Sequence, residues 1–157
     1  MPGELDSFDL KILDVLQKDA TKPTTEIADE VGLSQAPCWR RIQRLREAGY
    51  IRGQVALLDR QKLGLTAHIF AHVKLNAHGR SNLTGFVDAI RQFPEVLDCY
   101  VLMGAVDFML RVVTKDIEAY ERFFFDKLSQ VPGVQEVNSM VALSEIKSTT
   151  ALPLDRL

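Results

Sequence analysis

The hydrophobic period of the chain changes after its first third. Over residues 5–50 the apolar residues recur three or four positions apart, as they do along one face of a helix. Over residues 66–75 they alternate with other residues, which is the period of a strand. A chain of 157 residues, 46% of them hydrophobic, can bury two modest cores. The pattern predicts an N-terminal helical unit followed by a unit built on a sheet, an α+β chain.

Three short helices are expected in the N-terminal unit, because a residue suited to capping a helix N-terminus precedes each apolar stretch. In chain order the capping candidates are Asp6 or Ser7, Thr24 or Thr25, and Ser34. Gly32 and Gly49 stand where a left-handed residue would end the second and third helices. Residues 51–58 then form a strand candidate, which would be the wing of a winged helix-turn-helix.

The third helix, expected over residues 34–48, carries arginines on one side. Cys38, Ile42 and Leu45 recur at i, i+4 and i+7 and form the stripe that faces a core. An opposite face rich in arginine and glutamine suits the major groove of DNA, where arginine pairs with guanine and glutamine with adenine. The candidate DNA-contacting residues are Ser34, Gln35, Ala36, Trp39, Arg40, Arg41, Gln43 and Arg44.

The distribution of charge favours double-stranded DNA as a partner over an ordinary solvated surface. Residues 1–33 hold three Lys/Arg and eight Asp/Glu, whereas residues 34–52 hold five Arg and one Glu. The formal net charge is only −2, so any DNA contact must be local. We expect Arg40 and Arg44 to be central and Arg41, on the flank, to touch phosphate or brace the domain. Trp39 either contacts a base or packs against the first helix.

Beyond residue 65, strand and helix patterns follow the order βαββαβ, which is a ferredoxin-like arrangement. The expected strands are 66–75, 96–103, 108–113 and 134–146, with helices at 83–90 and 116–128. An internal repeat supports two similar halves, because Gln92–Asp98 resembles Gln130–Glu136 and each lies where a helix gives way to a strand. The predicted domains are residues 1–58 for DNA binding, a linker over 59–64, and residues 65–157.

Both faces of the predicted sheet carry large apolar side chains. Along 96–103 and 108–113, apolar residues occupy the odd and the even positions alike. Two helices can cover only one face of a four-stranded sheet. The other face therefore needs a partner, most simply a second copy of the chain, and we expect at least a dimer.

The sequence gives little support to other kinds of site. The start of the chain lacks the features of a signal peptide and no apolar run approaches the ~20 residues of a membrane span, so we expect a cytoplasmic protein with no membrane partner. Cys38 and Cys99 show no CxxC spacing and are expected to be reduced, buried thiols. His68 and His72 lie about 13 Å apart along one strand, too far to share a metal within one chain. A metal bridging subunits stays open, but no metal, cofactor or enzymatic activity is predicted.

These motifs together resemble the Lrp/AsnC family of transcription regulators (leucine-responsive and asparagine regulators, also called feast/famine regulators). The resemblance spans nearly the whole chain. Its most specific segments are Pro37–Arg41, Arg44–Ile51, Ala56–Asp59, Gly104–Phe108 and Thr149–Pro153.

The resemblance implies a winged helix-turn-helix DNA-binding domain and a ferredoxin-like domain that binds a small effector, usually an amino acid. It also implies homo-oligomers, dimers that often form octamers, with the effector held between neighbouring C-terminal domains. The family's effector contacts map to Val101, Leu102, Met103, Gly104, Asp107, Met140, Ser148, Thr149 and Thr150. Asp107 can instead be a turn carboxylate that bonds its own backbone. The alternative functions are a ligand-independent architectural DNA-binding protein and a metabolic ligand-binding module.

Overall fold

The computed structural model describes residues 5–156, and the chain divides into two compact units. One contains the chain up to Leu57 together with the residues from Lys147 onward, and the other is Leu58–Ile146. We expected the last residues to belong with the sheet. They group with the helices because Gln17 binds the backbone of Leu152 twice, donating to its carbonyl at 2.9 Å and accepting from its N–H at 2.7 Å.

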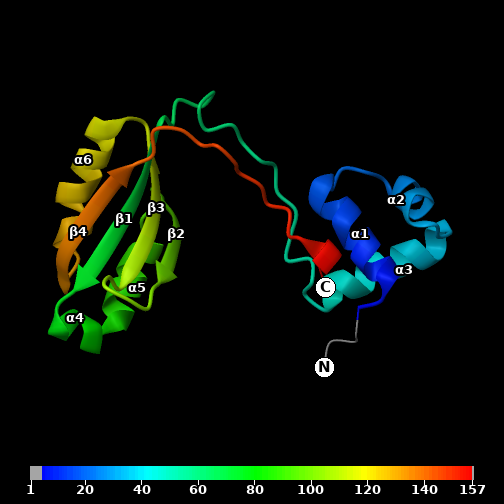
Figure 1. Ribbon diagram of the computed structural model, residues 1–157, viewed down its shortest axis with the longest axis horizontal. Helices are drawn as coiled ribbons and strands as arrows, with labels where there is room; N and C mark the ends of the chain where they lie inside the picture. Colours follow the sequence, from blue (N-terminus) through cyan, green and yellow to red (C-terminus); the bar gives the residue numbers. More distant parts are fainter. Residues whose placement is uncertain (1–4, 157) are drawn as a thin grey trace. The chain divides into compact units, whose positions relative to one another are not determined.

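The first unit is a bundle of three helices, α1 (Ser7–Lys18), α2 (Thr24–Val31) and α3 (Gln35–Glu47), visible in Figure 1. Their apolar faces form one core, made of Ile12, Leu16, Ile27, Ala28, Val31, Cys38, Ile42 and Leu45. The stripe predicted for α3 is therefore confirmed. Burial raises the pKa of the Cys38 thiol, which keeps it protonated and unreactive.

The helix ends follow the sequence signals in most places. Asp6 caps α1 and accepts hydrogen bonds from the backbone of Phe8 and Asp9. Gly32 and Gly49 have the left-handed φ values of 76° and 80° that end α2 and α3. The cap of α2 was predicted wrongly. Pro23 occupies that position, because its fixed φ of −66° already suits the residue before a helix.

The wing strand expected at residues 51–58 is not formed within this chain. Residues 52–58 have neither helix nor strand, and the side chains of Val55, Leu57 and Leu58 are exposed. A strand needs a neighbour that accepts and donates its backbone hydrogen bonds. The sheet of the described residues contains only strands of the second unit, so this segment has no ladder partner in its own chain.

The second unit is a four-stranded antiparallel sheet with the order β2-β3-β1-β4. Its strands are β1 (Ala67–Leu75), β2 (Val96–Val101), β3 (Phe108–Thr114) and β4 (Val134–Val141). The ferredoxin-like prediction is confirmed, although β2 and β4 end two and five residues earlier than the expected ends at 103 and 146.

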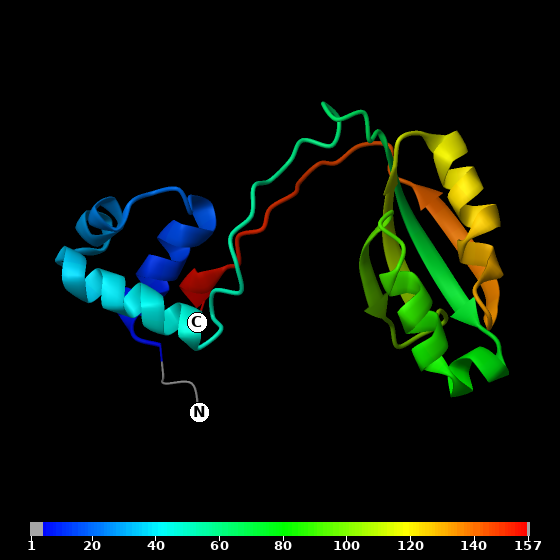
Figure 2. The same cartoon turned by 180° about the vertical axis from the view of Figure 1, so that it is seen from behind.

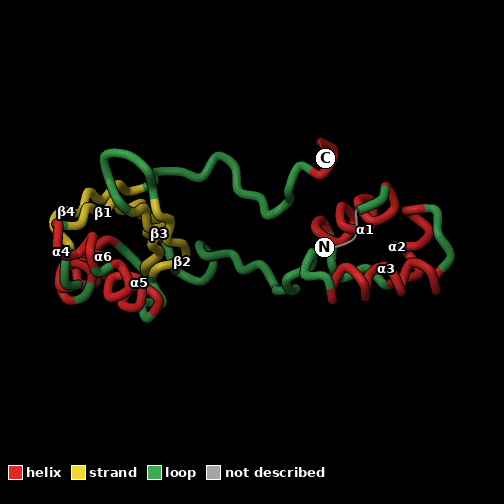
Figure 3. Tube along the Cα trace, turned by 90° about the horizontal axis from the view of Figure 1, so that it is seen from below, coloured by secondary structure: helices red, strands yellow, loops and turns green. Residues whose placement is uncertain are grey.

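Three further helices and two short 3₁₀ turns complete the described part of the chain. They are α4 (Ala77–Ser81), α5 (Leu83–Arg91), α6 (Ile117–Asp126), η1 (Leu128–Gln130) and η2 (Leu154–Arg156). Figure 3 shows α5 and α6 on the same side of the sheet. There they cover a core in which Phe86 of α5 stacks against Phe108 of β3 with ring centroids 4.4 Å apart. The helix α4 was not anticipated, and it follows directly from β1 (Figure 2).

The side of the sheet without helices is less apolar than predicted. The strand register places Phe70, Tyr100, Met109 and Met140 on it. The same side also carries charge, because Arg111 of β3 pairs with Asp98 of β2. We call this side of the sheet the open face. Every second residue of each strand lies on it, including Phe70, Asp98, Tyr100, Met109, Arg111 and Met140.

The reactive side chains of Cys99 and His68 lie in different environments. Cys99 is exposed rather than buried, because β2 is an edge strand with β3 on one side only. His68, near the start of β1, is buried, and burial lowers its pKa from the ordinary value. No group of three or more His, Cys, Asp or Glu side chains in the described residues is arranged to hold a metal. Over the same residues, no helix combines the length and hydropathy of a membrane span.

Candidate DNA-binding surface and effector site

The outward side of α3 presents most of the residues predicted to meet DNA. Ser34, Gln35, Ala36, Trp39, Arg40 and Arg44 are exposed, whereas Arg41 and Gln43 are half-buried. Trp39 exposes 53% of its surface, so much of the ring is free for contact with another molecule. Arg40, Arg41 and Arg44 line a shallow hollow of about 270 Å³ together with Pro37. Three guanidinium groups around one hollow suit a phosphate or the acceptor edge of a guanine.

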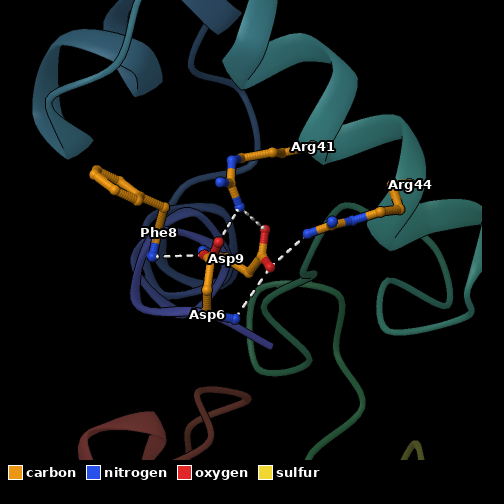
Figure 4. Close-up of polar contacts among 5 residues, drawn as sticks. All are labelled: Asp6, Phe8, Asp9, Arg41 and Arg44. Atoms are coloured by element: carbon orange, nitrogen blue, oxygen red, sulfur yellow. Dashed lines mark hydrogen bonds and ion pairs between the residues drawn. The ribbon is translucent and has the colours of Figure 1, made fainter. Parts of the chain in front are cut away.

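Two of these arginines are tied to α1 through a buried carboxylate (Figure 4). Asp9 is fully buried. It accepts hydrogen bonds from Arg41 Nη1 at 2.8 Å and from Arg44 Nη2 at 2.5 Å, so both of its oxygens face a guanidinium. Arg41 Nη1 also reaches Asp6 at 2.6 Å. A buried carboxylate needs this pairing, since an unpaired charge inside a protein is strongly unfavourable.

The pairing changes the roles expected for the two arginines. Arg41 braces α3 against α1, which is one of the two roles predicted for it. The backbone N–H of Asp9 and the Arg41 guanidinium lower the pKa of Asp6, and the two carboxylates raise the pKa of Arg41. Arg44 is 59% exposed yet holds Asp9 with one terminal nitrogen. Only Arg40 of the three has an exposed side chain without an ion pair in the described part of the chain.

Asp9 is the buried partner of this arginine surface that the sequence analysis missed. The signal was present, because Asp6 and Asp9 have the spacing of a capping box, in which each side chain bonds the backbone of the other. The capping box accounts for both carboxylates through hydrogen bonds within α1, so it gives no reason to expect a contact with α3. The contact with α3 spans 32 and 35 residues of sequence, and no local pattern predicts it.

The turn between β2 and β3 contains the predicted effector residues Leu102, Met103, Gly104 and Asp107. Met103 is fully exposed, and the α-carbon of Gly104 faces open space. The turn is closed by the N–H of Leu102, which donates to the Asp107 carbonyl at 2.8 Å. Val101, the last residue of β2, is also exposed. The backbone here is therefore accessible to a ligand.

Asp107 fastens this turn to the end of β1. Its N–H donates to the carbonyl of Val73 at 3.0 Å, and its Oδ2 accepts from the N–H of Leu75 at 2.7 Å. Arg80 of α4 donates through Nε to both carboxylate oxygens, at 3.2 and 3.4 Å. The carboxylate is 25% exposed, so it has surface left for a ligand. It bonds the backbone of a different strand, rather than that of its own turn.

The remaining predicted effector residues lie elsewhere. Met140 is on the open face opposite Phe70, whereas Val73, beside the turn, is opposite Val137. Three residues of strand separate the two positions, which is about 10 Å. Ser148, Thr149 and Thr150 are exposed, have no helix or strand, and group with the first unit. Within the second unit, the described chain therefore brings together the turn residues but not Met140.

Comparison with known proteins agrees with both halves of the chain. Residues 5–52 match the winged helix-turn-helix DNA-binding domain, and residues 68–152 match the Lrp/AsnC ligand binding domain. The DNA-binding transcriptional activator DecR of Escherichia coli strain K12 is 37% identical over 151 residues, covering 96% of this chain and 99% of that protein. The proline dehydrogenase transcriptional activator of Rhizobium radiobacter is 40% identical over 146 residues, covering 93% and 94%.

A solved structure is similar over the same length. The crystal structure of a transcriptional regulator from Neisseria meningitidis in complex with L-Met has a TM-score of 0.93, is 37% identical, and covers 98% of this chain and 99% of that one. A helix-turn-helix unit with a cationic helix, joined to a ferredoxin-like ligand-binding unit, defines a DNA-binding transcription regulator with a ligand-binding domain. The chain belongs to the Lrp/AsnC family.

Proposed function

We propose that this regulator responds to a free amino acid and binds its operators through α3. The observation that supports it most directly is the Asp107 carboxylate, which lies at an accessible turn of the ligand-binding domain with exposed surface remaining. A related regulator of the same fold forms a complex with L-Met. An amino acid carries an ammonium, for which a carboxylate is the matching acceptor.

The effector is recognised at the turn in two parts. Asp107 accepts the ligand's ammonium, and the backbone N–H groups around Gly104 approach its carboxylate. Leu102, Met103 and Met140 form the compartment for the side chain, with Met140 and residues 148–150 supplied by neighbouring copies. The reason for assigning Met140 in this way is its separation from the turn along β4 of its own sheet. The protein acts by binding alone, in the cytoplasm, and needs no cofactor or catalysis.

A thermal-shift screen of the twenty amino acids, followed by DNase footprinting with and without the hits, tests this function. A ligand that binds only the folded state raises the melting temperature. A footprint that changes with the amino acid identifies an effector-responsive regulator. An unchanging footprint that spreads over any DNA would indicate an architectural protein instead. Amino-acid binding with no footprint would indicate a metabolic ligand-binding module.

DNA recognition is proposed to centre on Arg40, since Arg41 and Arg44 are partly occupied by Asp9. Replacing Arg40 by alanine should cost about 1–3 kcal/mol of operator binding at one base position if the residue reads guanine. The measurement is fluorescence anisotropy on the operator and on singly substituted operators. Arg46→Ala is the matched control, because it removes an exposed arginine from another side of the same helix. Equal losses in the two variants would assign Arg40 to general electrostatics.

The homo-oligomer is proposed to form through the open face, with a second copy covering Phe70, Tyr100 and Met109. Light scattering at micromolar concentration should give at least a dimer. Met109→Asp should shift the mass towards a monomer, because a new carboxylate on a buried contact is unpaired. Phe125→Asp, at an exposed position of α6, is the control and should leave the mass unchanged. A monomeric wild type that still binds specific DNA would overturn this part of the proposal.

The segment 52–58, which has no strand partner in the described part of its own chain, offers a second place where copies can pair backbone to backbone. Octamers are expected from the family.

A further inference from the structure

Arg80 lies beside the proposed effector carboxylate, although no sequence motif pointed to it. Its contact with Asp107 uses Nε alone, at 3.2 and 3.4 Å from the two oxygens. Tight pairs of this kind have distances of about 2.7–2.9 Å, so this pair is loose. The side chain is 52% exposed. In the described part of the chain, the two terminal nitrogens of Arg80 have no protein partner.

The position of Arg80 is fixed by packing that leaves little freedom to α4. Asn76 caps this helix and accepts a hydrogen bond from the N–H of Gly79 at 2.8 Å, while its own N–H donates to Gly133 at 2.9 Å. The backbones of Gly79 and Gly133 touch so closely that a Cβ on Gly79 would lie 2.7 Å from the Gly133 carbonyl. The backbone of α4 is therefore held against the start of β4, which places the Arg80 side chain within reach of Asp107 in the turn.

The side chains of Arg80 and Asp107 make a pair of opposite charges beside the accessible turn. An amino acid has the same two charges on one carbon, and its carboxylate matches the planar fork of a guanidinium. An ammonium on Asp107 would therefore bring the adjacent carboxylate towards Arg80. The loose Nε contact can persist while the terminal nitrogens of Arg80 take the ligand.

We propose that Arg80 binds the α-carboxylate of the effector and restricts the ligand to molecules with both a free ammonium and a free carboxylate. This inference rests on the proposed role of Asp107 as the ammonium acceptor. It adds a specificity residue from α4 to a site otherwise assigned to the turn. Amino-acid amides and esters keep the ammonium but lose the anion. They are rejected because the Arg80 guanidinium then has no carboxylate to pair with.

A cycle of protein and ligand changes tests the contact. Calorimetry is done with L-methionine and L-methionine amide on the wild-type protein, Arg80→Ala, Arg80→Lys and Arg91→Ala. Wild type should prefer L-methionine to the amide, and Arg80→Ala should reduce this preference by about ten- to a hundredfold. Arg80→Lys should retain part of the preference, because it keeps the charge but not the fork. Arg91→Ala removes an exposed arginine from α5 and should change nothing.

The outcomes separate this inference from the proposed function. A preference that is equal in wild type and Arg80→Ala would mean that Arg80 only braces the turn. Tighter binding of L-methionine by Arg80→Ala would show that Arg80 competes with the ligand for Asp107, and would also overturn the inference. If wild type binds neither L-methionine nor any other amino acid of the screen, the amino-acid effector itself is wrong, and the role of Arg80 fails with it.

Discussion

Replacing Arg41 and Arg44 together by alanine is expected to lower the free energy of unfolding of the helical unit by about 3–5 kcal/mol. The reason is Asp9, which is fully buried and has a guanidinium on each oxygen. Without both arginines its charge has no counterion. Urea unfolding followed by the fluorescence of Trp39, the single tryptophan of the chain, reports on this unit alone.

Two matched variants show whether the loss comes from the orphaned carboxylate. Adding Asp9→Leu to the double variant removes that charge and should restore most of the stability, because a buried ion pair and an apolar side chain of similar size are often equivalent. Arg40→Ala/Arg46→Ala removes the same charge from α3 but leaves Asp9 paired, so its effect should stay within about 0.5 kcal/mol per site. An equal loss in both double variants would contradict the buried-charge explanation. The comparison also matters for DNA binding, since a weakened operator affinity in Arg44→Ala can come from a loosened α3.

Replacing Asp107 by alanine should abolish the response to the effector while operator binding in its absence persists. Charge-assisted hydrogen bonds contribute about 1.5–3 kcal/mol, so the ligand affinity should fall by about ten- to a hundredfold or more. Asp107→Asn is the informative companion, because its oxygen can still accept from the N–H of Leu75 and keep the turn in place. The measurements are calorimetry with L-methionine and footprinting on the same proteins.

The two substitutions at Asp107 distinguish recognition from local structure. If the carboxylate receives the ammonium, both variants lose affinity, because asparagine carries no charge. If Asp107 only fastens the turn to β1, Asp107→Asn should bind the ligand as well as wild type does, and only Asp107→Ala should be impaired. Equal affinity in all three proteins would remove Asp107 from the site.

The sequence alone determined the architecture because that information is local. Apolar residues spaced at the helical period of 3.6 predicted the three N-terminal helices. Apolar residues at alternate positions, in segments separated by helical patterns, predicted the order βαββαβ. Gly32 and Gly49 were found because a left-handed residue at a helix end favours glycine. The arginine side of α3 was predicted as the face opposite the apolar stripe of Cys38, Ile42 and Leu45.

Tertiary structure decided which of the predicted residues meet. Asp9 lies 32 and 35 positions from its arginines, and Arg80 lies 27 positions from Asp107, so their contacts come from packing and have no sequence period. The helix α4, which was not anticipated, packs against the start of β4 because Gly79 and Gly133 let the two backbones touch. These glycines are 54 positions apart (133 minus 79), so no local pattern in the sequence shows that they meet. The wing strand predicted at residues 51–58 is not formed for a related reason. Strand propensity is local, but the pairing partner of a strand is supplied by another segment or another copy.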